Sequence, residues 1–323
     1  MRISVVLPTH NRIEFLREAI ASVQRQTWAD WELIVVDDGS QPSAQRCTAD
    51  DSNQPVKWLR NESAQGLSGA RNRGMAAAEG DIVIFLDDDD LLADDALAAV
   101  AKAFETLADL ECLFINVEPF GEGARGMREN QARTLTALLA KAGVPENGES
   151  PVPLGPQLFG ALLDGLPLAL QRVAIRKALL QRVGPLQPGP FGDMEWNFRV
   201  ALRCHCWLLR DPLYRFRCSG QSFFSRNEAK ARLADAVIRV HLQLAALPEV
   251  SAQPQLASKV KHALARSRFE KVYLAHTEQK QFPWRDFVLP VKSAPAWRHA
   301  SLLARACLSR LRGTGKPQQH EGP

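Results

Sequence analysis

Long apolar runs are missing from this 323-residue sequence. No window reaches the roughly 18 consecutive apolar residues that a membrane-spanning helix needs, so we expect no transmembrane segment. Residues 1–5 lead directly into an apolar stretch, without the charged and apolar regions that build a signal peptide. These two absences favour a cytoplasmic location.

Paired cysteine motifs are also missing. Cys204 and Cys206 flank His205, but no second ligand pair stands at zinc-site spacing among the six cysteines. We therefore interpret the cysteines as reduced residues of a core. Nucleic-acid-binding motifs and interleaved aromatic and basic residues are lacking as well, so we expect no nucleic-acid partner.

The sequence does contain an uneven distribution of charge. The net charge is +4, yet residues 1–118 carry 10 Lys and Arg against 21 Asp and Glu, whereas residues 119–323 carry 30 against 15. An acidic half is suited to holding a cation, and a basic half is suited to contacting an anionic surface.

Four consecutive aspartates follow an apolar run at residues 82–86. The run predicts a strand that is buried on both faces of a parallel sheet. Asp87, Asp88, Asp89 and Asp90 stand at its carboxyl end, where open α/β sheets bind ligands. Desolvated carboxylates are costly without a cation, so we interpret the cluster as a site for a divalent cation that also binds phosphates. The alternative is a solvated acidic turn in which one Asp caps the next helix.

Strands and helices alternate at the start of the chain, which predicts a doubly wound α/β layer. Apolar runs predict strands at 3–7, 33–36, 56–59, 82–86, 113–117 and 206–214. Helical spacing of apolar residues predicts helices from residue 12 and at 70–78, 93–107, 173–180 and 191–202.

The rest of the chain is less regular. Residues 119–156 are rich in Gly, Pro and Glu, which predicts a mobile loop around a short helix at 132–142. Helical patterns follow one another after residue 225, so we expect a helical extension at 226–312 and a disordered tail at 313–323.

Four segments stand in order within the first 95 residues: SVVLPTHNR at 4–12, QTWADWELIVVDDGS at 26–40, GLSGARNRG at 66–74 and FLDDDD at 85–90. Together they resemble the family-two glycosyltransferases, which are inverting nucleotide-sugar enzymes of the GT-A fold. The resemblance implies a Rossmann-like mixed sheet flanked by helices within residues 1–225. Residues 1–118 would form the nucleotide-binding half and residues 119–225 the acceptor-side half.

The resemblance also implies roles for individual residues. Asp38 would accept a hydrogen bond from the base, and Arg71 would stand near the diphosphate, where a guanidinium offers paired donors. Asp89, with Asp87 as a second ligand, would hold Mn²⁺ or Mg²⁺. The implied nucleotide-sugar-binding residues are Pro8, Thr9, His10, Asn11, Asp37, Asp38, Arg71, Asp87 and Asp88. The alternatives are a helix-face salt bridge for Arg71 and a turn-forming role for Asp37.

Inverting sugar transfer needs a carboxylate that removes the proton of the acceptor hydroxyl. The segment GDMEWNFR at 192–199 resembles the Glu-Asp-Trp-Asp-type segment of the family, with Asp193 in the position of the base and Gly192 replacing its acidic neighbour. Glu195 is the second candidate. The alternative for Asp193 is a helix cap.

A later segment, YRFRCSGQS at 214–222, resembles the family pattern Tyr-Arg-x-His-x-Gly-Ser with changes. Arg215 or Arg217 could compensate the charge of the leaving group, or the segment is an ordinary basic loop. The Gln-x-x-Arg-Trp element of processive polysaccharide synthases is missing from the sequence, which favours addition of a single sugar over polymerisation.

A helix at 296–312 would place Arg298, Arg305 and Arg312 on one face, with Trp297 near the opposite apolar face. Such a helix either lies on an anionic membrane surface or packs on its own domain.

The aspartate cluster and the family resemblance together imply a metal-dependent, hexosyltransferase-type enzyme of bacterial surface-polysaccharide assembly. It would act in the cytoplasm or on the cytoplasmic face of the inner membrane, with a glycan or lipid-linked acceptor. A non-catalytic nucleotide-sugar-binding or scaffold protein of the same fold is the alternative.

Overall fold

The computed structural model describes residues 1–48, 56–145, 149–165, 167–218 and 229–279. The chain divides into two units, Met1–Ser222 and Phe223–Pro323. The boundary predicted at residue 225 falls within 219–228, outside the described residues. The predicted helix at 296–312 and the predicted tail at 313–323 also lie outside them.

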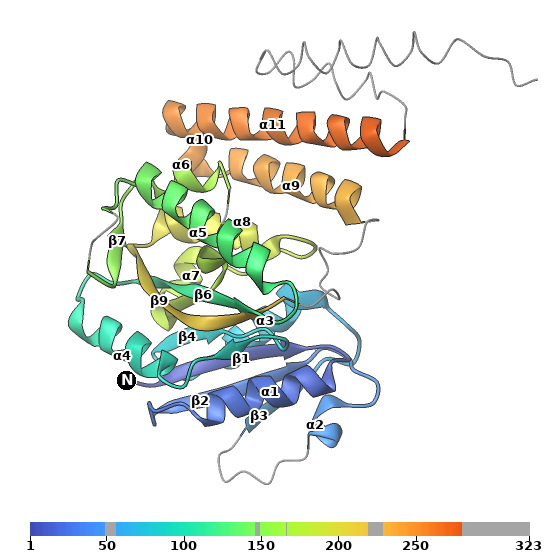
Figure 1. The fold of residues 1–323 in the computed structure, drawn as a ribbon, viewed down its shortest axis with the longest axis vertical. Helices are drawn as coiled ribbons and strands as arrows, with labels where there is room; N and C mark the ends of the chain where they lie inside the picture. Colours follow the sequence, from blue (N-terminus) through green and yellow to red (C-terminus); the bar gives the residue numbers. More distant parts are fainter. Residues whose placement is uncertain (49–55, 146–148, 166, 219–228, 280–323) are drawn as a thin grey trace, which may run out of the picture. The chain divides into compact units, whose positions relative to one another are not determined.

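Nine strands in the described part of the first unit form one sheet, in the order β3-β2-β1-β4-β8-β6-β9-β5, with β7 paired to β9 (Figure 1). The strands are β1 (Ile3–Thr9), β2 (Trp31–Asp37), β3 (Val56–Arg60), β4 (Ile82–Phe85), β5 (Leu91–Leu92), β6 (Cys112–Phe120), β7 (Val152–Leu154), β8 (Val173–Arg176) and β9 (Cys206–Arg217). The helices are α1 (Ile13–Gln24), α2 (Ala44–Cys47), α3 (Gly66–Ala77), α4 (Ala96–Thr106), α5 (Ala124–Lys141), α6 (Leu158–Leu162), α7 (Leu180–Val183) and α8 (Gly192–Arg203), with 3₁₀ turns η1 (Leu168–Gln171) and η2 (Lys177–Leu179).

Parallel and antiparallel strands are mixed in this sheet. Strands β3, β2, β1 and β4 are parallel. Strand β8 runs antiparallel to both β4 and β6, and β9 runs parallel to β6. The expected mixed sheet flanked by helices is therefore confirmed.

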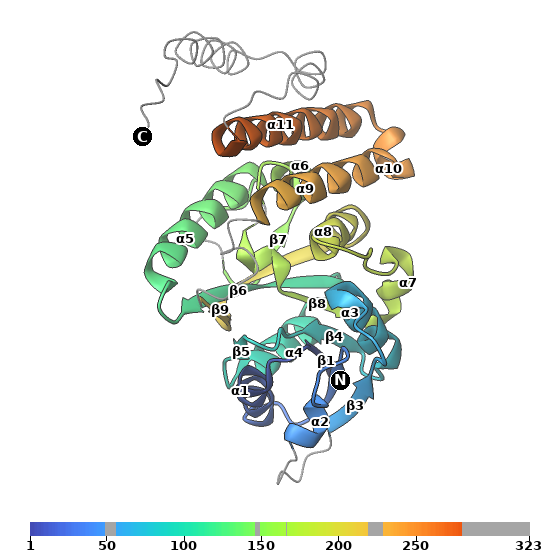
Figure 2. The same cartoon turned by 90° about the vertical axis from the view of Figure 1, so that its right-hand side faces the viewer.

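Helices cover both faces of the central strands (Figure 2). On one face, Leu7 of β1 belongs to an apolar core that also includes residues of α1 and α4. On the other face, Gly74 of α3 lies so near β1 that an added Cβ would come within 2.3 Å of Val6. Phe85 of β4 meets Trp196 of α8 edge to face, with ring centroids 5.8 Å apart. Because both faces are buried, these strands are apolar throughout rather than alternately apolar and polar.

Two sequence predictions for the later part of the chain are wrong. Residues 124–141 form an 18-residue helix, α5, where the composition predicts a loop with a shorter helix at 132–142. Residues 173–176 form strand β8 and not the start of a helix, because Val173, Ala174 and Ile175 pair between neighbouring strands in the buried sheet. A short apolar run is ambiguous between helix and strand, and long-range pairing decides the outcome.

The described part of the second unit is helical as far as residue 279, in agreement with the sequence prediction. It contains α9 (Ala229–Ala245), α10 (Pro248–Ser251) and α11 (Pro254–Gln279). Buried His241 of α9 lies with its Nδ1 3.1 Å from the hydroxyl of Ser267 in α11. Within the described ranges of the chain, every helix is too short or too polar to cross a membrane.

Candidate active site

Three parallel strands end side by side at one edge of the sheet (Figure 1). Strand β1 lies between β2 and β4, and its last residue, Thr9, is paired with Asp37 of β2. The main-chain N–H of Asp38 donates to the carbonyl of Thr9 at 2.9 Å. The two acidic segments therefore flank the residues that follow β1, as the sequence predicts for strands of one wound sheet.

Asp37 is buried and forms a turn. Its carboxylate accepts hydrogen bonds from the main chain of Ser40 at 2.8 Å and of Ala44 at 3.0 Å, and it is paired with Arg60 of β3. Burial opposes ionisation, but these hydrogen bonds and the Arg60 charge lower the pKa of Asp37 below its ordinary value. With both oxygens bonded inside the protein, Asp37 has the contacts of the turn-forming alternative.

Asp38 joins the end of β2 to the start of α3. Its carboxylate accepts from the side chain of Asn61 at 2.6 Å and from the main-chain N–H groups of Gln65 and Gly66, each at 2.8 Å. The carboxylate is 4% exposed. A nucleotide base would thus meet a carboxylate that is already held in place by the loop before α3.

The residues after β1 lie next to Asp38. His10 is exposed, and its Nδ1 lies 2.8 Å from the carbonyl oxygen of Asp38, which makes Nδ1–H the donor. The His10 Nε2 then accepts from the amide of Asn11 at 2.9 Å. Both edges of the imidazole are bonded, so its ring face is the part left for a base. Pro8 lies inside β1 and is buried.

The four aspartates after β4, which we call the aspartate tetrad (Asp87–Asp90), are contacted by three arginines. Arg71 of α3 binds Asp87 at 2.5 Å. Arg12 binds Asp89 at 2.8 Å and lies 3.3 Å from Asp88, which also accepts from the hydroxyl of Thr9 at 2.8 Å. Arg172 binds Asp90 at 2.9 Å and lies 3.5 Å from Asp87. Arg12 and Arg172 thus each bridge two aspartates of the tetrad.

The four carboxyls of the tetrad differ in their pKa values: that of Asp87 is lowered, and the other three are raised. Burial opposes ionisation of Asp87 as well, but Arg71 and Arg172 lower its pKa. For Asp88, burial outweighs the Thr9 and Arg12 contacts and raises the pKa to about 6. Burial raises the pKa of Asp90 to about 7, against the pull of Arg172, and burial together with the Asp87 charge raises the pKa of Asp89. Three of the four carboxyls are therefore harder to ionise than a free aspartate, and a cation bound beside them would favour their charged form.

Arg71 connects the tetrad to Asp193. The Arg71 guanidinium is buried, stacks over Phe85 at 5.5 Å, and places Nη1 3.5 Å from a carboxylate oxygen of Asp193. The side chain of Asp193 is 29% exposed at the start of α8. The structure thus brings the predicted base, the predicted diphosphate ligand and the predicted D-x-D aspartate into one chain of contacts.

Glu195 lies apart from this chain of contacts. It is 3% exposed and forms a two-pronged ion pair with Arg199 one turn later, at 2.8 and 2.7 Å. The i,i+4 spacing of the two residues is a signal that the sequence already contains. Gly192 has a packing reason, because an added Cβ would come within 2.1 Å of the Gln187 carbonyl. An acidic side chain has no room there.

Three residues of this site, Arg12, Arg172 and Tyr214, are missing from the predicted set. Arg172 immediately precedes β8, and Tyr214 belongs to β9, so both reach the tetrad through long-range strand pairing. The buried hydroxyl of Tyr214 accepts a hydrogen bond from the main-chain N–H of Asp87 at 3.1 Å. Arg217, a candidate for leaving-group compensation, also contacts the tetrad. Its main-chain N–H donates to the Asp90 carboxylate and its Nε to the Asp89 carbonyl, each at 2.8 Å, while its Nη2 pairs with Glu18 at 2.7 Å.

The residues present fit a divalent cation that is shared with a ligand. The ion cluster comprises the five carboxylates of Asp87, Asp88, Asp89, Asp90 and Asp193 and the three guanidiniums of Arg12, Arg71 and Arg172. Fully ionised, it has two uncompensated negative charges. No three His, Cys, Asp or Glu side chains of the described residues could hold a metal by themselves. Magnesium at nucleotide sites is commonly bound by one or two carboxylates plus phosphates. Asp87 and Asp89, with side chains 21% and 22% exposed, suit that arrangement.

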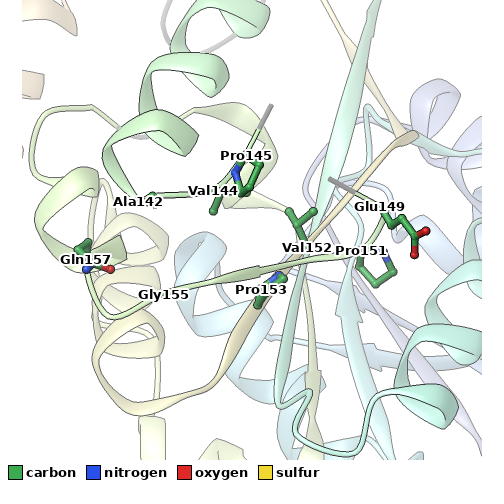
Figure 3. A pocket seen from close by; sticks show the side chains of 10 residues that line it. Ala142, Val144, Pro145, Glu149, Pro151, Val152, Pro153, Gly155 and Gln157 are labelled. Carbon is green, nitrogen blue, oxygen red and sulfur yellow. The ribbon is translucent and has the colours of Figure 1, made fainter. Parts of the chain in front are cut away.

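A hollow of about 560 Å³ elsewhere in the first unit shares no residue with this site (Figure 3). Its lining within residues 142–157 is largely apolar, with prolines at 145, 151 and 153 and Glu149 as the one charged side chain in the described lining. A nucleotide diphosphate needs cations or phosphate-binding donors, so this hollow does not match the chemistry that the sequence predicts.

Solved structures share this architecture, which is the GT-A fold expected from the sequence. The structure of S. aureus TarS 1-349 in complex with UDP-GlcNAc matches with a TM-score of 0.63 and 16% identity over 99% of this chain and 94% of that chain. The mannosyltransferase PcManGT from Pyrobaculum calidifontis, in complex with GDP-Man and Mn²⁺, matches with a TM-score of 0.53 and 15% identity over 96% and 80%. At these identities the likeness shows the fold.

Sequence comparisons agree with the resemblance seen in the motifs. Residues 4–148, a little under half of the chain, match the model of glycosyl transferase family 2. It is 38% identical over 89 residues to UDP-Glc:alpha-D-GlcNAc-diphosphoundecaprenol beta-1,3-glucosyltransferase WfgD of Escherichia coli, over 28% of this chain and 35% of that protein. It is 41% identical over 244 residues to the O-antigen biosynthesis protein RfbC of Myxococcus xanthus, over 73% of this chain and 17% of that protein. The chain thus spans about a third of one relative and less than a fifth of the other.

Proposed function

We propose that this chain is a metal-dependent glycosyltransferase that moves one sugar, with inversion, from a nucleotide diphosphate sugar to a glycan or lipid-linked acceptor. The observation that carries this proposal is the contact of Arg71 with both Asp87 and Asp193. Through Arg71, Asp87, which would bind the donor, is connected to Asp193, a partly exposed carboxylate from a different part of the chain. Displacement at a sugar carbon requires such a carboxylate as the base.

The donor would bind across the three strand ends. The base lies against the ring of His10 and donates a hydrogen bond to Asp38. Asp37 holds the turn that follows β2. The other residues around the base are Pro8, Thr9 and Asn11. Asp87 accepts from the ribose, and Asp88 supports the first strand through Thr9. Arg71 serves the diphosphate, and its buried Nε finds no acceptor among the described residues, so the guanidinium has a donor to give.

Asp193 acts as the base in this proposal. Its carboxylate takes the proton of the acceptor hydroxyl while that oxygen forms a bond to the anomeric carbon, and the nucleotide diphosphate leaves with the electron pair of the broken bond. Arg71 orients Asp193 and offsets charge that develops on the leaving group.

Asp89, assisted by Asp87, would hold Mn²⁺ or Mg²⁺. When bound, this cation supplies positive charge to the leaving diphosphate. The excess of five carboxyls over three guanidiniums in the ion cluster supports this assignment, as does the Mn²⁺ in the PcManGT complex.

We place the reaction in bacterial surface-polysaccharide assembly, in lipopolysaccharide, O antigen or capsule. The relatives support this placement, since one acts on a diphosphoundecaprenol-linked sugar and the other is named for O-antigen biosynthesis. A lipid-linked acceptor would bring the chain to the cytoplasmic face of the inner membrane.

The test is a panel of UDP-, GDP- and dTDP-sugars with the full chain, with and without Mn²⁺. Transfer or slow donor hydrolysis that requires Mn²⁺ is the expected result. Nucleotide binding without any transfer or hydrolysis would instead favour the non-catalytic alternative.

A further inference from the structure

Arg172 reaches the aspartate tetrad from 82 residues away in the sequence. It immediately precedes β8, which pairs with β4 in the register Ile84 to Ala174. Continuing that register by two residues brings Arg172 opposite Leu86, next to Asp87. Arg172 is therefore placed by the sheet itself and not by a loop.

The Arg172 side chain is buried between aromatic rings and carboxylates. It is 5% exposed, and its guanidinium stacks over the rings of Tyr214 at 4.7 Å and Phe216 at 5.5 Å. Its Nη2 lies 2.9 Å from Asp90 and 3.5 Å from Asp87, whereas its Nε has no hydrogen-bond partner among the described residues. Stacking on two rings and pairing with two carboxylates restrict the position of the guanidinium.

Asp87 is held from two directions. Its Oδ1 binds Arg71 and its Oδ2 faces Arg172, while its main-chain N–H donates to Tyr214. Arg71 also contacts Asp193. The contacts therefore run in a line from Asp193 through Arg71, Asp87 and Arg172 to Asp90.

We propose that Arg172 is a positioning residue that keeps Asp87 oriented in the donor site. The proposal rests on the proposed function, in which Arg71 serves the diphosphate. A guanidinium shared between Asp87, Asp193 and a diphosphate holds each of them less firmly than before the donor binds. Arg172 makes no contact with the donor in this arrangement, so it remains the fixed partner of Asp87 throughout.

The first test compares wild type, Arg172→Met and Arg172→Lys in steady-state transfer and in calorimetric binding of the nucleotide diphosphate with Mn²⁺. Misorientation of a binding group costs about 100-fold in kcat/KM, and we expect this loss for Arg172→Met together with a weaker Kd. Arg172→Lys keeps the charge but lacks the planar fork that bridges two carboxylates, so we expect roughly a 10-fold loss.

A double variant separates positioning from charge neutralisation. Arg172→Met leaves Asp90 buried without its cation, which can impair folding. In Arg172→Met with Asp90→Asn, that unpaired charge is gone, so folding should recover while nucleotide binding and transfer stay weak. Recovery of wild-type binding in the double variant would overturn the proposal, because Arg172 would then merely neutralise Asp90.

Arg176→Met is the matched control. Arg176 ends the same strand, stacks over Phe104 at 5.2 Å and donates to main-chain carbonyls, but it pairs with Ile82 at the opposite end of β4. Its loss should leave the nucleotide Kd unchanged. If wild type is active and Arg172→Met has the same kcat/KM and nucleotide Kd, this inference alone is overturned. If wild type transfers no sugar and hydrolyses no donor, the proposed function is overturned as well.

Discussion

Two strand ends of this protein look alike in sequence and differ in structure. Each is an apolar run followed by aspartates, Asp37–Asp38 after β2 and Asp87–Asp90 after β4. At the first, main-chain N–H groups and nearby side chains take up both carboxylates, and the pKa of Asp37 is lowered despite burial. At the second, three arginines from distant segments serve four carboxylates, and burial raises the pKa of Asp88 to about 6 and that of Asp90 to about 7.

The difference teaches how to distinguish structural from ligand-binding acidic turns. Aspartates that are satisfied by donors of their own turn hold the loop together. Aspartates that outnumber their internal cations are harder to ionise, and an external cation would favour their charged form. Mutation of the first strand end should therefore lower stability, even at Asp38, where we propose that the base binds. Mutation of the second should change ligand binding and turnover with little loss of stability.

The largest loss of activity is expected for a change at Asp193, the carboxylate that Arg71 connects to the tetrad. Asp193→Asn keeps a side chain of the same size beside Arg71 but cannot accept the hydroxyl proton. We expect kcat to fall by about 10³-fold or more, within the range for loss of a general base, while the nucleotide Kd stays near wild type. Steady-state kinetics and calorimetry measure the two quantities separately.

Glu195→Gln provides the control for that variant. Glu195 pairs with buried Arg199, so the change should cost roughly 3 kcal/mol of stability. Turnover per folded molecule should stay close to wild type. A Glu195→Gln protein that folds but does not turn over, beside an active Asp193→Asn, would transfer the role of base to Glu195.

The next largest effect is expected on the free energy of unfolding. Urea unfolding without metal compares one variant from each strand end. Asp38→Asn leaves three N–H donors facing an amide, so we expect a loss of about 2 kcal/mol. Asp89→Asn removes a carboxylate whose pKa is raised by burial and by Asp87, so stability should be unchanged or higher. Equal losses in both variants would remove the distinction between the strand ends.

A smaller, pH-dependent effect is expected at Asp37. Its pKa is lowered in the folded protein, because hydrogen bonds from Ser40 and Ala44 and the Arg60 charge overcome burial. A carboxyl of this kind stabilises the fold above its unfolded pKa of about 3.9, and the contribution is lost as the pH falls through the folded pKa. Asp37→Asn should therefore lose about 1–2 kcal/mol at pH 7, with a difference from wild type that shrinks below about pH 4. Urea titrations at several pH values give both numbers, and a difference that grows in acid would contradict this assignment.

The smallest effect is expected for His10→Phe. Phenylalanine keeps a flat ring beside the Asp38 carbonyl but loses the two hydrogen bonds that hold the imidazole. If the ring face stacks on the base, nucleotide affinity should change by no more than about 3-fold, since stacking does not need the ring nitrogens. A loss well beyond that in calorimetry would mean that an imidazole nitrogen binds the base.

The sequence predicts the first four strands well. In β1, β2 and β4, residues buried on both faces form apolar runs that end in turn residues. Strand β3 is only partly buried and has a shorter apolar signal. The acidic strand ends follow from the same reading, whereas Arg71 and Asp193 follow from the resemblance to the glycosyltransferase family. The structure brings these residues together. Strand β8 is misread as a helix, since four apolar or ambiguous residues have no period of their own.

That error has a direct consequence for the site. Arg172 reaches Asp87 and Asp90 only through the antiparallel pairing of β8 with β4, so no local pattern identifies it. The excess of carboxylates predicts that cations lie beside them. Which of these cations are arginines and which is a metal ion depends on long-range strand pairing, which the sequence pattern does not contain. Glu195, in contrast, could have been assigned from its spacing to Arg199.

The central claim is that the aspartate tetrad binds a divalent cation and, through it, a diphosphate. Calorimetric titration of UDP and GDP into wild type and Asp89→Asn, each with and without Mn²⁺, tests it most directly. We expect at least one nucleotide to bind wild type with a strong Mn²⁺ requirement, and Asp89→Asn to bind it with the same weak affinity in both conditions. Binding that is equally tight without Mn²⁺, or a Mn²⁺ effect that survives in Asp89→Asn, would contradict the claim.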